Sequence, residues 1–239
     1  MPARASSLPA DRASWTISGA IAAVQAAATE ARLDLAAPTR GLVIAAAEGP
    51  DHLLGIDLHA VTTSADHWVR GGDLTVVYEP GDVRGLRATA MWRVLHAAEA
   101  AWELVVSAQT SLLHAEAALS VVSEMAGGDV RWTADAAAPT RWTPLDPSRP
   151  LPPEAMAVLV RRSKTAVVVA VHPQDPRRIT VTGATGRTRV ECSIFPAAIE
   201  KGVILRSRVL AAIGAAHSAD TWAGDMCAAF AASPPFLDT

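Results

Sequence analysis

The chain has 239 residues, of which 50% are hydrophobic and 19% are charged, with a formal net charge of −3. This composition excludes a disordered chain, and the lack of a basic surplus argues against a nucleic-acid partner. No apolar run reaches the roughly 18 residues that span a bilayer, so no membrane-spanning segment is expected. The length suits one large domain, since sandwiches and barrels of this size fold as single units.

The alanine-rich residues 1–31 have two interpretations. Residues 17–28 are almost wholly apolar and follow basic residues, as in a signal peptide, but Asp11 lies in the region that signal peptides keep free of acids. We therefore expect residues 1–31 to fold with the single domain of residues 32–239 in a cytoplasmic protein. A secreted or periplasmic protein is the alternative, if residues 1–28 are a signal peptide.

From residue 32 onward, short apolar runs are separated by Pro, Gly and Asp, which is typical of strands joined by tight turns. The predicted strands span residues 33–35, 42–46, 53–61, 74–78, 87–95, 102–107, 118–122, 130–133, 156–160, 165–171, 179–182, 188–195 and 203–210. An Ala-rich connector after His96 is expected to join two of them. Alternation within residues 87–95 places Trp92 in the core. Because no long helix intervenes, the pattern predicts an all-β, antiparallel two-sheet sandwich.

Two segments depart from this rhythm. Residues 139–153 contain too many prolines to pair in the middle of a sheet, so we expect them to wrap an edge or rim. Near the C-terminus, Ser218 or Asp220 begins a short predicted helix, on which Trp222, Met226 and Phe230 recur every four residues. This helix is expected to pack over the sheet.

Motifs for nucleotide binding and serine hydrolysis are absent. The two cysteines lack the paired spacing of a zinc site and are expected to be small buried hydrophobic residues. Three histidines, His52, His59 and His67, lie close in sequence, but no carboxylate accompanies them at the spacing of a metal triad. We therefore predict neither a metal nor a cofactor.

Exposed aromatic residues are candidates for sugar binding, because a flat indole face stacks on the apolar face of a sugar ring. Trp68 stands near Arg70 and is followed by the pair Gly71-Gly72 and by Asp73. The glycines permit close approach of a ligand, and the charged side chains offer hydrogen bonds to hydroxyl groups. A bulged β-hairpin is the alternative interpretation of the same segment.

The predicted strand 188–195 carries a carboxylate in a position suited to proton transfer. Its alternation places Arg189, Glu191 and Ser193 on the face opposite the apolar residues. A strand holds a general base more firmly than a loop does, so Glu191 is the candidate catalytic residue. A solvent-facing ion pair between Glu191 and Arg189 is the alternative.

Residues 190–196, Val-Glu-Cys-Ser-Ile-Phe-Pro, resemble the late strand of the aldose 1-epimerases, or galactose mutarotases. In that family a hydrophobic residue, a catalytic glutamate, three variable residues, an aromatic residue and a proline follow in this order. The resemblance implies a β-supersandwich fold, with Glu191 as the base that removes the proton of the anomeric hydroxyl. The family's acid is a histidine in a motif with asparagine and an aromatic residue, and no histidine here lies in such a motif.

Two hypotheses follow. The first is a carbohydrate-binding or carbohydrate-active protein, either an epimerase or mutarotase (an isomerase) or a lyase-associated domain, with a sugar as its ligand. Its concave site would combine the catalytic Glu191 with a set of substrate-binding residues, namely Trp68, Arg70, Asp73, Arg93 and Arg189. The second is a non-enzymatic structural or protein-interaction sandwich with a flat Trp and Arg surface. The sequence does not indicate an oligomeric state.

Overall fold

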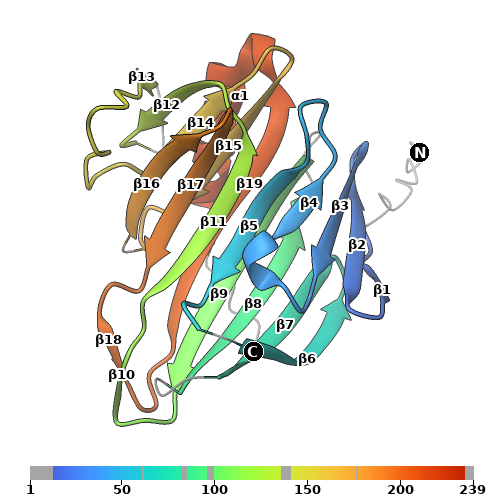
Figure 1. The fold of residues 1–239 in the computed structure, drawn as a ribbon, viewed down its shortest axis with the longest axis vertical. Helices are drawn as coiled ribbons and strands as arrows, with labels where there is room; N and C mark the ends of the chain where they lie inside the picture. The colour runs from blue at the N-terminus through green and yellow to red at the C-terminus, as the bar shows by residue number, and fades with distance from the viewer. Residues whose placement is uncertain are drawn as a thin grey trace, which may run out of the picture.

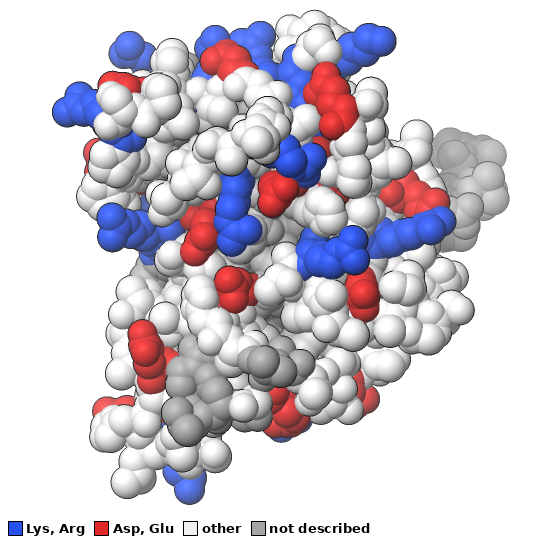
Figure 2. All heavy atoms as spheres, in the orientation of Figure 1, with Lys and Arg blue, Asp and Glu red and all other residues white. Residues whose placement is uncertain are grey.

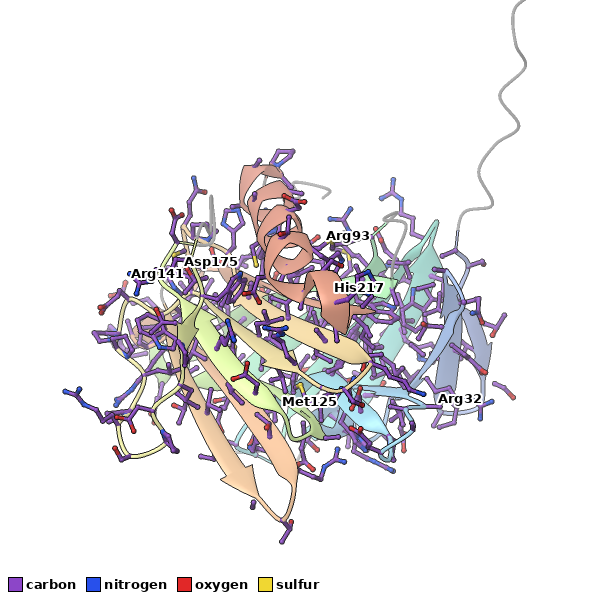
Figure 3. All side chains as sticks on the ribbon, turned by 90° about the horizontal axis from the view of Figure 1, so that it is seen from above. Arg32, Arg93, Met125, Arg141, Asp175 and His217 are labelled. Carbon is purple, nitrogen blue, oxygen red and sulfur yellow. The ribbon has the colours of Figure 1, made fainter. Side chains whose placement is uncertain are left out.

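The computed structural model describes residues 13–60, 62–81, 85–95, 100–135, 141–175 and 177–234. They form two large antiparallel sheets that face each other, with one helix, α1 (Ala219–Ala232), outside the second sheet (Figures 1 and 3). The predicted all-β sandwich with one short C-terminal helix is confirmed. No helix in these ranges is long and apolar enough to cross a membrane. The connector predicted after His96 lies outside the described residues.

Figure 1 views the eight-stranded sheet from its outer side. In spatial order its strands are β1 (Thr16–Ser18), β2 (Ile21–Ala26), β3 (Thr29–Asp34), β4 (Leu42–Ile44), β5 (Asp51–Asp57), β11 (Leu119–Ala126), β17 (Arg187–Ile194) and β16 (Arg177–Ala184). The centre of this sheet joins three distant parts of the chain, because β11 pairs with β5 on one side and with β17 on the other.

The nine-stranded sheet lies behind the first in Figure 1. Its order is β13 (Thr143–Pro144), β12 (Asp129–Thr133), β14 (Ala157–Arg161), β15 (Thr165–Val171), β19 (Leu205–Ala215), β9 (Ala100–Thr110), β8 (Leu86–Val94), β7 (Asp73–Pro80) and β6 (Thr62–Arg70). The small elements are a two-stranded ribbon of β10 (His114–Glu116) and β18 (Ala198–Glu200), and the 3-10 turns η1 (Pro38–Arg40) and η2 (Ala216–Ser218). The described part of the proline-rich segment provides the edge strand β13, as expected of prolines.

Several strands were not predicted, and their composition explains why. In β2, Ala22, Val24 and Ala26 are buried while the residues between them are not, so the strand is regular, but alanine has low β-propensity and hides the pattern. In β6, the edge strand of its sheet, most side chains are exposed, so its sequence lacks alternating hydrophobicity. Burial alternates along β2 without a matching contrast in its sequence, whereas β6 is defined by its pairing with β7.

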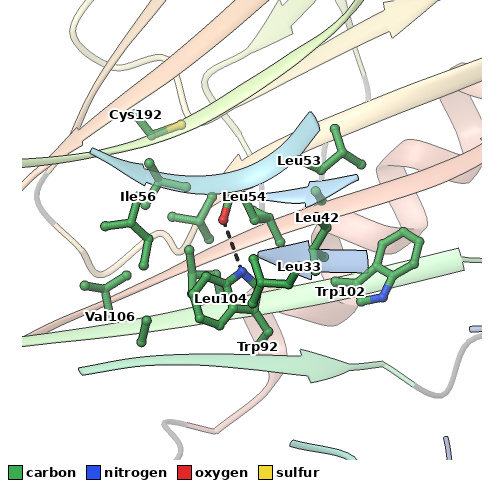
Figure 4. Packing of buried hydrophobic residues seen from close by; sticks show 14 of the residues in the cluster. Leu33, Leu42, Leu53, Leu54, Ile56, Trp92, Trp102, Leu104, Val106 and Cys192 are labelled. Carbon is green, nitrogen blue, oxygen red and sulfur yellow. Dashed lines mark hydrogen bonds between the residues drawn. The ribbon is translucent and has the colours of Figure 1, made fainter. Parts of the chain in front are cut away.

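The core between the sheets is centred on Trp92, which is fully buried as predicted. Its Nε1 donates a hydrogen bond of 3.1 Å to the backbone oxygen of Leu54 (Figure 4). Leu54 has a φ of 57°, and its N–H donates to the Ser123 hydroxyl at 3.1 Å. Here β5 carries a bulge, since two of its residues oppose the single residue Ser123 between the pairs formed by Val122 and Glu124. The bulge shifts the register by one residue, so His52 pairs with Glu124 and shares its outward face.

Helix α1 covers part of the outer face of the nine-stranded sheet, where it packs on β14, β15 and β19 (Figure 3). Its buried stripe consists of Ala219, Ala223, Cys227 and Phe230. The predicted stripe of Trp222, Met226 and Phe230 is therefore wrong in part, because Trp222 and Met226 are only half-buried at its margin. Three residues of this stripe, Ala219, Ala223 and Cys227, are small, which lets the helix approach the sheet closely.

Both cysteines are buried, as expected. Burial raises the pKa of the Cys192 thiol to about 12, with a further contribution from the charge of Glu191, and burial raises the pKa of Cys227 to about 12. Because the thiolate is the reactive form, we expect neither thiol of the native protein to react with a disulfide reagent at pH 8. Both should react after denaturation in guanidinium, counted by absorbance. Rapid labelling of the native chain would show that the core opens readily.

Candidate functional site

The candidate site begins on β17, where side chains alternate between the core and the outer face of the eight-stranded sheet. Val190, Cys192 and Ile194 are buried, whereas Glu191 lies outward with 32% of its side chain exposed. The predicted orientation of this strand is confirmed. Figure 2 shows acidic and basic side chains side by side across the middle of this face.

Glu191 is held by two neighbours, each of which contacts a different carboxylate oxygen. The Ser120 hydroxyl on β11 donates to Oε1 at 2.9 Å. The Nη2 of Arg189 lies 3.5 Å from Oε2, at the limit of a hydrogen bond. The carboxylate therefore has a fixed orientation and keeps room to accept a further proton or hydrogen bond.

His59 reaches the same hydroxyl from the end of β5. Its backbone has a φ of 50°, outside the conformations usual for a histidine, and its N–H donates to the Asp57 Oδ1 at 2.8 Å. The ring Nδ1 lies 3.4 Å from that same oxygen, and Nε2 lies 3.5 Å from the Ser120 Oγ. Since the Ser120 proton goes to Glu191, Oγ is the acceptor toward His59. One hydroxyl thus separates a carboxylate from an imidazole that can donate a proton.

A pocket of about 200 Å³ adjoins this group, and its lining is Thr39, Arg40, His52, Val122, Glu124 and Arg189. Glu191 borders it, because Val122 is its direct cross-strand partner. Two glycines bring the turn η1 against β5: a Cβ on Gly55 would lie 2.3 Å from the Thr39 oxygen, and one on Gly41 would lie 2.3 Å from the Leu53 oxygen. This close backbone packing places Thr39 and Arg40 over the outer face.

The remaining predicted binding residues lie on the other side of the sandwich. Trp68, Arg70, Asp73 and Arg93 share the outer face of the nine-stranded sheet, because the core side of β7 is taken by Leu74 and the strands pair in register. Arg93 contacts Asp73 at 3.4 Å and the buried Glu103 at 2.9 Å. Figure 3 shows Arg93 on the side of the sandwich that carries α1. The expectation that these four residues share one concave face with Glu191 and Arg189 is therefore wrong.

The segment around Gly71 and Gly72 is a tight hairpin between β6 and β7, with Gly71 at a φ of 60° and a bulge between Ser64 and Asp66. The hairpin interpretation of this sequence is confirmed. The backbone that approaches Gly72 is the chain's own, since the Ala13 oxygen would lie 3.3 Å from a Cβ at Gly72. The Gly72 oxygen also accepts a hydrogen bond of 3.0 Å from the indole Nε1 of Trp15. Trp68 is 44% exposed beside it.

His59 and Ser120 were missed by sequence reasoning. Ser120 lies in a largely apolar strand, and only the register with β17 places it beside Glu191. The position of the His59 ring depends on a left-handed backbone conformation, which no sequence pattern predicts. Across the described ranges, no group of three or more His, Cys, Asp or Glu side chains is arranged to hold a metal ion.

No known family model and no curated protein matches the sequence. Solved structures do match in fold. A "putative aldose 1-epimerase" from Klebsiella pneumoniae matches at 7% identity with a TM-score of 0.52, over 92% of this chain and 87% of its own. The protein HI1317 matches at 8% identity with a TM-score of 0.50, over 87% of this chain and 97% of its own. A "putative aldose 1-epimerase" from Escherichia coli K12 matches at 9% identity with a TM-score of 0.48, over 85% of this chain and 99% of its own. The two matches with a TM-score of at least 0.50 support a galactose mutarotase-like fold for this chain.

Proposed function

We propose that the outer face of the eight-stranded sheet binds an aldose at Glu191 and catalyses the interconversion of its two anomers. The observation that carries this proposal is the convergence of Glu191 and His59 on the Ser120 hydroxyl. Anomer exchange requires a proton acceptor and a proton donor on one accessible face, and we assign these roles to Glu191 and His59. The fold, which the chain has in common with proteins described as aldose 1-epimerases, supports the same choice.

The reaction needs no redox step or cofactor. Glu191 takes the proton of the anomeric hydroxyl while His59 gives a proton to the ring oxygen, so the bond between that oxygen and the anomeric carbon breaks and a carbonyl forms. Rotation about the adjacent carbon–carbon bond presents the other carbonyl face. The ring oxygen then adds to the carbonyl, and both protons return to complete the cycle. The Asp57 Oδ1, 3.4 Å from the Nδ1 of His59, holds the ring in position for this transfer.

The direct test follows anomer exchange by magnetisation-transfer NMR or polarimetry with a panel of neutral and acidic aldoses. We expect a rate above the buffer rate, in proportion to protein concentration, for at least one sugar. If every sugar in the panel exchanges at the buffer rate, the proposal is wrong.

Ser120 is expected to position Glu191 rather than to react. The S120A variant removes the hydrogen bond to the carboxylate, and because a bond to a charged group contributes about 1.5–3 kcal/mol, kcat should fall at least about tenfold. The exposed turn residue Ser163 provides the matched control, S163A, which should retain the wild-type rate. Equal rates for the two variants would contradict this role.

The second candidate function is binding of a protein partner without catalysis. Trp68 and Val69 favour it, since they are 44% and 36% exposed on the edge strand β6. Two results together would support it: buffer-rate exchange for all sugars, and a self-association in sedimentation that W68A abolishes.

A further inference from the structure

The pocket beside Glu191 is lined by two arginine side chains, Arg40 and Arg189, that have few acidic partners. No described residue forms a hydrogen bond or ion pair with the Arg40 guanidinium, although Arg40 lines the pocket. Within the described part of the chain, the contact at 3.5 Å with Glu191 is the only polar contact of the Arg189 side chain. Both guanidinium groups thus retain most of their five donor N–H groups for a ligand.

The one acidic residue in the pocket lining is already neutralised. Glu124 accepts a hydrogen bond of 2.6 Å from the Nε of Arg187. The Nη2 of the same arginine donates to the backbone oxygens of Pro50 and Glu124 at 2.9 Å and 3.3 Å. Arg187 therefore uses its donor groups within the protein and does not add to the charge available to a ligand. The lining as a whole keeps a surplus of positive charge that comes from Arg40 and Arg189.

Of the other polar side chains of the pocket, Thr39 can donate to an anion, whereas His52 offers an acceptor for a hydroxyl group. The Nδ1 of His52 lies 3.2 Å from the backbone oxygen of Arg40, and since a carbonyl only accepts, Nδ1 carries the proton. This bond fixes the ring beside η1. It leaves Nε2, which has no bond to a described residue, as an acceptor for a hydroxyl group of the ligand. Thr39 adds an exposed hydroxyl. At about 200 Å³, the pocket is smaller than the roughly 300–1,000 Å³ of drug-sized sites, so it suits one small group.

We infer that this pocket binds the anionic group of an acidic monosaccharide, a carboxylate or a phosphate, while the sugar ring lies over Glu191. The inference rests on the proposed function and adds the substrate class to it. Arg40 and Arg189 are the residues that recognise the anion, because guanidinium groups pair with carboxylate and phosphate oxygens through two parallel hydrogen bonds.

The experiment compares anomer exchange of glucose, glucuronate and glucose 6-phosphate by the wild-type protein, R40Q and R70Q. A charge-assisted contact predicts a kcat/KM at least about tenfold higher for one acidic sugar than for glucose. R40Q should reduce this ratio toward one. R70Q is the matched control, because Arg70 is exposed on the opposite sheet, and it should retain the wild-type ratio. The better acidic substrate identifies the group as carboxylate or phosphate.

A second measurement probes the pocket without a sugar. Inorganic phosphate should shift the imidazole NMR signals of His52, assigned with H52Q, and R40Q should weaken this response about tenfold. Equal rates for neutral and acidic sugars, with no response to phosphate, would overturn the inference and leave the proposed function intact. A response to phosphate without exchange of any sugar would overturn the proposed function and the assignment of the anion to a sugar.

Discussion

The E191Q variant is expected to lose most anomer exchange, with kcat lower by about 10²–10⁴-fold, the usual contribution of general acid–base catalysis. Glutamine preserves the shape of the side chain and its hydrogen bond from Ser120, but it does not accept a proton from the anomeric hydroxyl. Because 32% of the Glu191 side chain is exposed, the substitution should change the free energy of unfolding by no more than about 0.5 kcal/mol. Exchange kinetics and a denaturation curve on the same sample separate the two effects.

The control for this variant is E200Q. Glu200 lies on the ribbon strand β18 with 69% of its side chain exposed, and it belongs to neither the Glu191 group nor the pocket. It should exchange anomers at the wild-type rate. If E191Q and E200Q were equally active, Glu191 would be no more than a solvent-facing partner of Arg189.

The W92A variant is expected to have the largest effect on stability, lowering the free energy of unfolding by about 3–5 kcal/mol. Trp92 is fully buried between the sheets, so its removal leaves a cavity, and the Leu54 oxygen loses its hydrogen-bond donor. A denaturant titration followed by circular dichroism measures the change.

W68A is the matched control, because the same side chain is removed from a position that is 44% exposed. It should change stability by about 0.5 kcal/mol or less. A similar loss in W68A and W92A would contradict the assignment of Trp92 to the core. If W92A keeps the wild-type stability but changes the NMR signals of His52, then Trp92 supports the bulge at Leu54, and through it the site, and not the stability of the core.

Hydrophobic periodicity was sufficient to predict much of the fold, because alternation reports directly on burial. It placed Trp92 inside and Glu191 outside, and both are confirmed. It did not predict β2 or β6, because alanine and exposed polar residues do not show the period of two.

The composition of the candidate site was harder to predict, because alternation separates inside from outside without saying which sheet a strand joins. Arg93 and Glu191 both lie outward, but on opposite sides of the sandwich. The pairing of β11 with both β5 and β17 depends on contacts between residues far apart in the sequence. That pairing brings Ser120 and His59 close to Glu191, and no local sequence pattern predicts the pairing.

A crystal structure of the E191Q variant with an aldose that the wild-type protein converts would show directly which side chains face the anomeric carbon. We expect the sugar to lie on the outer face of the eight-stranded sheet. Its anomeric hydroxyl should lie within about 2.6–3.2 Å of the side chain at position 191, with the ring oxygen toward His59. A sugar bound only beside Trp68, or an empty outer face at saturating sugar, would contradict this expectation.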